Sequence, residues 1–396
     1  MHVNERQYDR VKEKDKTMRL ILCLAVLFAL SFAVPGQEQP VSTPKTPEEM
    51  WKVIAPYFAP PEKYKDDLGK YPSPLKFYDG RPVKTPADWQ ERRKEILKFW
   101  NETMGQWPAL IEKPKVETLA SEHVEDFTRK KVRVEVGPGK TTDAWLLVPD
   151  GKGPFPAVLT VFYGPDDAAG LVEKSRGSID FGYQLTKRGF VTLNIGSPPE
   201  YQPADRKPSL QPLSWLACVA ANCHTALAQM PEVDAKRIGV IGHSYGGKWA
   251  LFASCLYDKF AAAVWCDPGI VFDETRPNVN YWEPWYLGLD PGVKRKAGIP
   301  SAENPRTGPY KTLYESGHDL VELHALMAPR PFLVSGGSED LSERWQALNH
   351  AVAVNRFLGR ENRVALTTRD VHRPTPEALE QICLFFVYFL RPGETK

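Results

Sequence analysis

The second half of the chain alternates short apolar segments with segments that suit helices, and this rhythm constrains the fold most. The apolar segments are expected strands, at 157–163, 190–195, 237–242, 260–266, 331–335 and 364–368. Helices fit between them, at 178–188, 212–230, 246–257, 342–358 and 375–390. Strands that are apolar throughout belong to a parallel sheet covered on both faces. We therefore expect an α/β fold with a mostly parallel, doubly wound sheet and helices on both faces.

Antiparallel strands are expected to lead into this sheet. Residues 129–136 and 143–149 alternate in polarity and flank Pro-Gly-Lys-Thr-Thr, which suits a hairpin turn. We place the main domain at 125–396. Within it, residues 268–318 form a long aromatic and proline-rich insertion, and a loop of that length between core elements usually carries function.

Residues 34–124 are interpreted as a proline-rich N-terminal arm that carries one helix. Thr85 is placed to cap this helix, Pro86 suits its first turn, and Asp88 stands at the capping-box position. The arm is too short to form the propeller domain that restricts access in some serine peptidases.

Residues 1–33 are interpreted as a leader. Their apolar run, 20–32, is short for a membrane span but suits a signal peptide, and Ser31-Phe32-Ala33 has the small-x-small form of a cleavage site. Met18 is interpreted as the true start, and residues 1–17 as a start-site artefact. We expect a periplasmic or secreted protein without stable membrane insertion after cleavage; an uncleaved anchor is the alternative.

Composition narrows the classes of partner. Apolar residues make up 42% and charged residues 25% of the chain, and the formal net charge is only +2. Such a surface lacks the basic stripe that neutralises phosphates, which argues against nucleic acid as a partner. Five cysteines follow the leader within apolar stretches and are interpreted as small buried side chains, although export leaves one disulfide possible.

Gly242-His243-Ser244-Tyr245-Gly246 matches the pattern G-x-S-x-G. An apolar strand precedes it and a helical segment follows it. This context is typical of the nucleophile elbow of α/β-hydrolases, where a strained corner exposes the serine hydroxyl. The sequence therefore predicts Ser244 as a nucleophile. The backbone N–H of Tyr245 and the loop around Tyr163 and Gly164 are the expected oxyanion donors.

In this fold the serine is followed along the chain by an acid and then a histidine. His372 follows the last expected strand and is the predicted general base. Asp340, after the strand at 331–335, is the preferred acid that holds the imidazole. Asp267, directly after the strand at 260–266, is the alternative acid.

Other polar residues receive structural interpretations. Asp273, Glu274 and Glu339 are lesser candidates for the acid, and His243 is expected to pack beside the elbow. His318 and His324, with Glu322, fall on one expected helix and imitate metal ligands, but no HExxH-type or CxxC pattern supports a metal site. We expect neither a metal nor a cofactor.

Three stretches carry a resemblance to a known family: GHSYGGKWAL, ELHALMAPRPFLVSGGSED and the terminal HRPTPEALEQICLFFVYFL. They resemble bacterial glucuronoyl esterases, carbohydrate esterase family fifteen, and their dienelactone-hydrolase-like relatives, over roughly residues 125–392. The resemblance implies a secreted, cofactor-independent serine esterase that cleaves an ester between glucuronic acid and an alcohol, typically a lignin alcohol.

Two positions bear on this resemblance. Lys248, four residues after the serine, matches the family lysine that hydrogen-bonds sugar hydroxyls. The structural alternative is that Lys248 is a solvated residue in the first turn of the helix. Tyr245 stands where the family has an arginine that stabilises the oxyanion. This departure concerns the choice of a glucuronoyl ester as substrate and leaves the expectation of ester hydrolysis intact. Trp282 and Trp285, in the aromatic insertion, are candidates for a sugar or aryl platform, with core packing as the alternative.

Three functions are compatible with these residues. The first is an exported serine carboxylic-ester hydrolase acting on carbohydrate-linked esters of glucuronoyl or acetyl type. The second is a prolyl-oligopeptidase-like serine peptidase, which shares the sheet and the order of the three residues. The third is a non-catalytic carbohydrate-binding protein on the same fold, because fold alone does not fix function.

Overall fold

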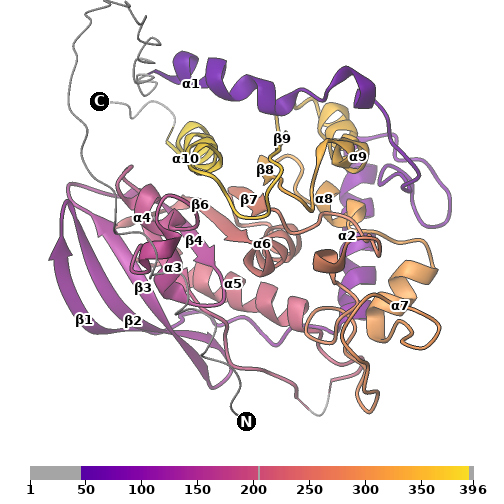
Figure 1. Cartoon of the computed structure of the whole chain (residues 1–396), viewed down its shortest axis with the longest axis horizontal. Coiled ribbons are helices and arrows are strands. Elements are labelled where there is room, and N and C mark those ends of the chain that lie inside the picture. Colours follow the sequence, from indigo (N-terminus) through magenta and orange to yellow (C-terminus); the bar gives the residue numbers. More distant parts are fainter. Residues whose placement is uncertain (1–45, 204–205, 392–396) are drawn as a thin grey trace, which may run out of the picture. The chain divides into compact units, whose positions relative to one another are not determined.

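The computed structural model describes residues 46–203 and 206–391, and these residues are organised around one nine-stranded sheet (Figure 1). Its strands lie in the order β1-β2-β3-β5-β4-β6-β7-β8-β9. They are β1 (Val116–Val124), β2 (Phe127–Gly137), β3 (Lys140–Pro149), β4 (Phe155–Val161), β5 (Val191–Ile195), β6 (Val233–His243), β7 (Ala262–Cys266), β8 (Phe332–Ser335) and β9 (Val364–Thr367). The leader expected at 1–33 lies outside the described residues.

The sheet is antiparallel at one edge and parallel elsewhere. β1, β2 and β3 form an antiparallel meander whose last strand pairs antiparallel with β5. From β5 through β4, β6, β7 and β8 to β9, every neighbouring pair is parallel. All six expected strands of the second half are present, and they are buried almost throughout because helices cover both faces. The predicted doubly wound α/β sheet with antiparallel entry strands is confirmed.

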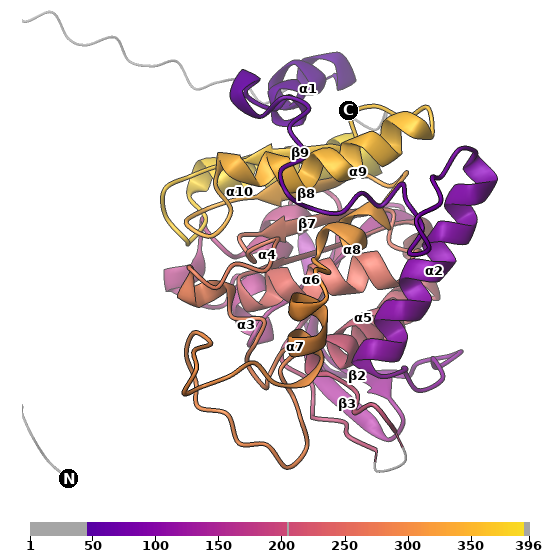
Figure 2. The ribbon, with the colours of Figure 1, turned by 90° about the vertical axis from the view of Figure 1, so that its right-hand side faces the viewer.

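Two groups of helices form the outer layers (Figure 2). On one face, α4 and α10 pack their apolar residues, including Leu185, Phe385 and Phe386, against strand residues such as Ile241 and Val264. On the other face, α5, α6, α8 and α9 close the larger core. The helices are α1 (Pro47–Ile54), α2 (Pro86–Met104), α3 (Pro165–Ala168), α4 (Phe181–Thr186), α5 (Pro212–Ala228), α6 (Tyr245–Leu256), α7 (Gly308–Glu315), α8 (Val321–Ala325), α9 (Trp345–Phe357) and α10 (Pro376–Leu390).

The N-terminal arm is packed onto this body. Its expected helix is α2, and the capping box forms as predicted: Asp88 N–H donates to the Thr85 hydroxyl at 3.1 Å, and Thr85 N–H donates to the Asp88 carboxylate at 2.9 Å. α1 packs against α10 (Figure 2). Sequence analysis missed β1, which is exposed over most of its length. The boundary expected at 125 therefore falls inside the β1–β2 hairpin.

Residues 268–318 form an insertion with little regular structure. It contains a 3₁₀ turn at Pro277–Val279 and the helix α7. Many of its apolar side chains, such as Tyr281, Leu287 and Tyr310, are buried in the main core. The insertion is therefore an integral layer over α6. In the described part of the chain, no helix combines the length and apolarity that crossing a bilayer requires.

Candidate active site

Ser244 occupies a sharp corner between β6 and α6. Its backbone φ of 54° and ψ of −111° lie in a region that side-chain-bearing residues rarely adopt. The Ser244 N–H donates to the Cys266 carbonyl at 2.8 Å, which ties the corner to the end of β7. The predicted strand–serine–helix elbow is present.

Two glycines allow this corner to close. A Cβ built on Gly242 would lie 2.2 Å from the Gly246 carbonyl oxygen, and one built on Gly246 would lie 2.0 Å from the Val161 carbonyl oxygen. Real Cβ atoms essentially never approach another atom that closely. The glycines two residues before and two residues after the serine are therefore required by the packing of α6 against β4 and β6.

Three side chains form a continuous hydrogen-bonded chain at this corner. His372 Nε2 lies 2.8 Å from Ser244 Oγ, and His372 Nδ1 lies 2.6 Å from Asp267 Oδ2. Both distances are within hydrogen-bonding range. One imidazole nitrogen is thus free to accept the serine proton while the other donates to a carboxylate.

The carboxylate of Asp267 is held in place by the loop after β8. Its Oδ1 accepts backbone N–H groups of Gly337, Glu339 and Asp340, at 2.6, 3.2 and 3.0 Å. The side chain is fully buried. These bonds compensate the loss of hydration of the ionised carboxylate and fix its orientation toward His372.

The preference for Asp340 over Asp267 as the partner of His372 is corrected by this geometry. Asp340 accepts the N–H groups of Gly269 and Ile270, at 2.8 and 2.7 Å, and lies 3.5 Å from Arg344. β7 lies between β6 and β8, so the first residue after β7 is nearer to Ser244 than a residue five positions after β8. Burial, reinforced by the charge of Asp267, raises the pKa of Asp340 above its usual range.

The lesser candidates for the acid are occupied elsewhere. Asp273 pairs with Arg344, at 2.7 Å. Glu274 pairs with Arg306, at 2.6 Å. Glu339 accepts a hydrogen bond from the Asn278 amide, at 3.2 Å.

The expected oxyanion donors come from the start of α6 and from the loop after β4. Tyr245 is the first residue of α6, so its N–H has no partner within the helix. Tyr163 and Gly164 follow β4, and the Tyr163 ring stacks on Tyr245 at a centroid distance of 4.5 Å. The Tyr163 carbonyl accepts Ser197 N–H at 3.1 Å, which anchors this loop to the segment after β5.

Sequence analysis missed Arg369, which supports the histidine loop. Its guanidinium donates to the His372 carbonyl at 2.7 Å, to the Ser335 and Gly336 carbonyls, each at 3.0 Å, and to the Arg373 carbonyl at 3.0 Å. One side chain thus joins the end of β8 to both sides of the loop turn. Its position three residues before the histidine was the only signal available from the sequence.

Lys248 is buried in the protein interior, with 2% of its surface exposed. Its ammonium donates to the Asn278 carbonyl at 3.0 Å and lies about 5 Å from the ring centres of Tyr281 and Tyr286. Burial lowers its pKa to about 8 against the opposing effect of nearby carboxylates. Neither expectation, a contact with substrate hydroxyls or a solvated helix residue, describes this environment.

The two tryptophans proposed as a platform differ in exposure. Trp282 is 1% exposed, and its indole N–H donates to Glu283 at 3.1 Å, so it belongs to the core. Trp285 is 49% exposed and lines a cleft of about 470 Å³ together with Tyr245. The structure therefore keeps Trp285 and removes Trp282 as a platform candidate.

The three other histidines considered from the sequence, His243, His318 and His324, have structural partners or are buried. His243 packs beside His372, with ring centres 4.7 Å apart, and burial holds its pKa well below the usual value. His318 bonds Glu322 at 3.0 Å and lies outside α8, the helix that carries the buried His324. Over the described residues, no group of three or more ligating side chains could hold a metal ion.

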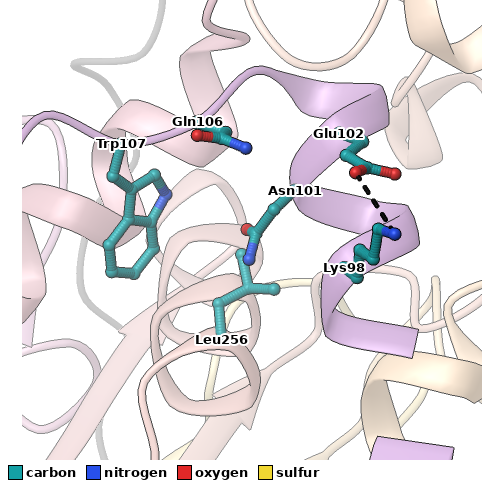
Figure 3. A pocket seen from close by; sticks show the side chains of 6 residues that line it. All are labelled: Lys98, Asn101, Glu102, Gln106, Trp107 and Leu256. Carbon is teal, nitrogen blue, oxygen red and sulfur yellow. Dashed lines mark ion pairs between the residues drawn. The ribbon is translucent and has the colours of Figure 1, made fainter. Parts of the chain in front are cut away.

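A second hollow, of about 300 Å³, lies away from the serine (Figure 3). It is lined by the end of α2, where Lys98 and Glu102 form an exposed ion pair at 3.9 Å, and by Leu256. Leu256 ends α6, whereas Ser244 precedes its first residue, and a helix of this length separates its ends by about 18 Å. This hollow is therefore separate from the candidate active site.

The fold of this chain is shared with solved esterases. A glucuronoyl esterase from Solibacter usitatus superposes with a TM-score of 0.65, at 20% identity over 83% of this chain and 99% of that protein. A carbohydrate esterase family 15 glucuronoyl esterase from Caldicellulosiruptor kristjansonii gives 0.58, at 21% identity over 83% and 92%. The chain has the α/β-hydrolase fold.

Among curated proteins, this chain is similar to a 4-O-methyl-glucuronoyl methylesterase from Thermothelomyces thermophilus. The two are 28% identical over 201 residues, which span 49% of this chain and 48% of that relative. The match thus spans about half the length of the curated relative. No family model matches the chain.

Proposed function

We propose that this α/β-hydrolase is an exported serine carboxylic-ester hydrolase that acts on carbohydrate-linked esters. The observation that carries the proposal is the 2.8 Å contact between His372 Nε2 and Ser244 Oγ, together with the 2.6 Å contact between His372 Nδ1 and the Asp267 carboxylate. The similarity to glucuronoyl esterases supports an ester of a sugar acid as substrate. The signal-peptide pattern expected at residues 1–33 supports export.

The chemistry proceeds in two halves. Ser244 Oγ attacks the ester carbonyl carbon while its proton passes to His372 Nε2, and Asp267 stabilises the imidazolium that forms. The N–H of Tyr245 and the loop at Tyr163 and Gly164 stabilise the oxyanion. The alcohol then leaves with the proton from Nε2. Water then gives a proton to the same nitrogen and attacks the acyl carbon; the bond from that carbon to Ser244 Oγ breaks, Oγ takes the proton back from Nε2, and the acid is released.

Two measurements test the reaction class. A fluorophosphonate probe should label the wild-type protein at Ser244 and leave the Ser244→Ala variant unlabelled. The same variant should lose hydrolysis of an activated aryl ester while its thermal unfolding stays unchanged. Absence of labelling in folded wild-type protein would instead favour a carbohydrate-binding protein on the same fold.

Substrate class and export need separate experiments. Benzyl glucuronate, acetylated xylan and a prolyl peptide, compared side by side, should show hydrolysis of a carbohydrate ester and none of the peptide. Preferential cleavage of the peptide would refute the ester assignment. N-terminal sequencing of the exported protein should begin near Val34, and an intact Met1 would refute the leader.

A further inference from the structure

The hollow at the C-terminal end of α2, away from Ser244, is lined by groups of mixed character. Figure 3 shows Trp107 and Asn101 on opposite sides of it. Gln106 lies along one edge and Leu256 along the other. Its volume of about 300 Å³ is at the lower end of the range for small-molecule sites. One aromatic ring, two planar amides and one aliphatic side chain therefore surround a space large enough for a small ligand.

The Trp107 ring is held in a fixed position. Its indole N–H donates to the Ser214 hydroxyl of α5 at 3.0 Å, and part of the ring packs against the main core. The Arg206 guanidinium donates to the carbonyls of Gln106 and Trp107, at 2.7 and 3.1 Å, which fixes the backbone that carries the ring. The ring is only partly buried, so the rest of its surface is accessible. A ligand that binds this surface has little side-chain ordering to pay for.

The two amides beside the ring are available to a ligand. In the part of the chain that the structure describes, the side chains of Asn101 and Gln106 make no hydrogen bond. Each amide offers two N–H donors and one carbonyl acceptor in a plane. The charged side chains of the hollow, Lys98 and Glu102, form an ion pair with each other at 3.9 Å, so their charges cancel. This lining favours a neutral ligand that carries several hydroxyl groups.

The hollow is the first of several that adjoin one another. It shares Gln106 with a neighbour of about 340 Å³, and that neighbour shares Lys207 with a larger hollow of about 820 Å³. Leu289 lines both this larger hollow and the cleft that Trp285 and Tyr245 line. Hollows with common walls form a continuous groove. An extended chain could therefore run along the surface from the end of α2 toward the serine.

We propose that the hollow lined by Trp107, Asn101 and Gln106 is a second carbohydrate-binding site, which holds a neutral pyranose unit of a polysaccharide. The ring of Trp107 covers the apolar face of the sugar, and the two amides bond its hydroxyls. Leu256 lies about 18 Å from Ser244 along α6, so the bound unit is remote from the reacting ester. The site goes beyond the proposed function, because it gives the N-terminal arm a binding role that needs no nucleophile.

Titration calorimetry with xylotriose and cellotriose tests the site, because neither probe contains an ester. We expect at least one of them to bind the wild-type protein. Gln106→Ala and Asn101→Ala should each weaken this binding about three- to tenfold, as the loss of a hydrogen bond predicts. Gln90→Ala, which removes an exposed amide elsewhere on α2, is the matched control and should leave the affinity unchanged. Absence of binding to wild type, or an equal loss in Gln90→Ala, would overturn the proposal.

Trp107→Ala tests the aromatic surface itself. It should weaken trisaccharide binding more than about tenfold, and Trp107→Phe, which keeps a ring, should retain part of the affinity. Thermal unfolding of each variant shows whether the fold is kept, since part of the ring packs against the core. If Trp107→Ala does not fold, the Asn101 and Gln106 variants decide the question. A folded Trp107→Ala protein with wild-type affinity would refute the role of the ring.

Trp285→Ala distinguishes this site from the cleft beside the serine. Trp285 is half-exposed and lines that cleft, so its removal should leave trisaccharide binding at the end of α2 unchanged. Lost binding in Trp285→Ala with full binding in Gln106→Ala would place the sugar in the cleft and overturn the proposal. Fluorophosphonate labelling of Ser244 tests the hydrolase separately, because the titration can succeed or fail whether or not the serine is labelled.

Discussion

Gly246→Ala sets two physical effects against each other at the elbow. Gly246 is the second residue of α6, and replacing a helical glycine with alanine stabilises a helix by up to about 1 kcal/mol. Here the added Cβ would lie 2.0 Å from the Val161 carbonyl oxygen, where real contacts begin at 3.0 Å. α6 and the end of β4 must therefore separate by about 1 Å.

The steric effect should exceed the gain in helix propensity. Forcing extra volume into a packed interior costs about 1–3 kcal/mol, and a contact between two backbones offers no flexible side chain that could yield. We expect a net loss of about 2 kcal/mol in the free energy of unfolding, which corresponds to a fall of about 3 °C in Tm. A displacement of Ser244 by about 1 Å should also lower kcat about 100-fold.

Thermal unfolding and hydrolysis of an activated aryl ester, measured on the same preparations, check both effects. Gly359→Ala is the control: its Cβ would meet nothing within 4 Å, and its φ of 67° should cost only about 1 kcal/mol. Hydrolysis should be intact in this control. A Gly246→Ala protein as stable as wild type, with kcat within about threefold, would refute the steric account of the elbow.

Three further predictions concern the surroundings of the site. Lys248→Met should remove a pH dependence of the free energy of unfolding. The pKa of Lys248 is about 8 in the folded protein and 10.5 ordinarily, so the lysine binds its proton more weakly when folded. The stability of the wild type should therefore rise by about 3 kcal/mol relative to the variant between pH 8 and 10.5. Parallel urea-unfolding curves across that window would contradict it. Asp340→Asn should lower kcat less than tenfold, because Asp340 holds the backbone at Gly269 and Ile270 rather than the imidazole; a loss above 1,000-fold would restore Asp340 as the orienting acid. Arg369→Gln should lower kcat more than about tenfold with KM little changed, and Arg369→Lys should recover part of the lost kcat. A rise in KM with kcat unchanged would exclude a role of Arg369 in holding His372.

Local signals predicted the elbow and the sheet correctly. Ser244 is fixed by a strand, two glycines and a helix that are contiguous in the chain, and His372 follows the final strand. The capping residues Thr85 and Asp88 likewise lie three positions apart. Such features depend on neighbours in sequence, so pattern reasoning captures them.

Features that depend on the order of strands in space were harder to predict. Choosing between Asp267 and Asp340 required knowing that β7 lies directly beside β6 and that the loop after β8 donates its N–H groups to Asp267. The burial of Lys248 and Trp282 arises because the insertion folds over α6, and the sequence contains no local signal for that packing. β1 was missed because its exposed residues carry no apolar pattern.

The kcat of Asp267→Asn tests the central geometry most directly. This substitution keeps the size of the side chain but disrupts the 2.6 Å contact with His372 Nδ1, so the imidazole loses the partner that fixes its tautomer. We predict a fall in kcat of about 10⁴-fold at neutral pH, with the fold retained. A kcat within tenfold of wild type would contradict the assignment of Ser244, His372 and Asp267 as one catalytic unit.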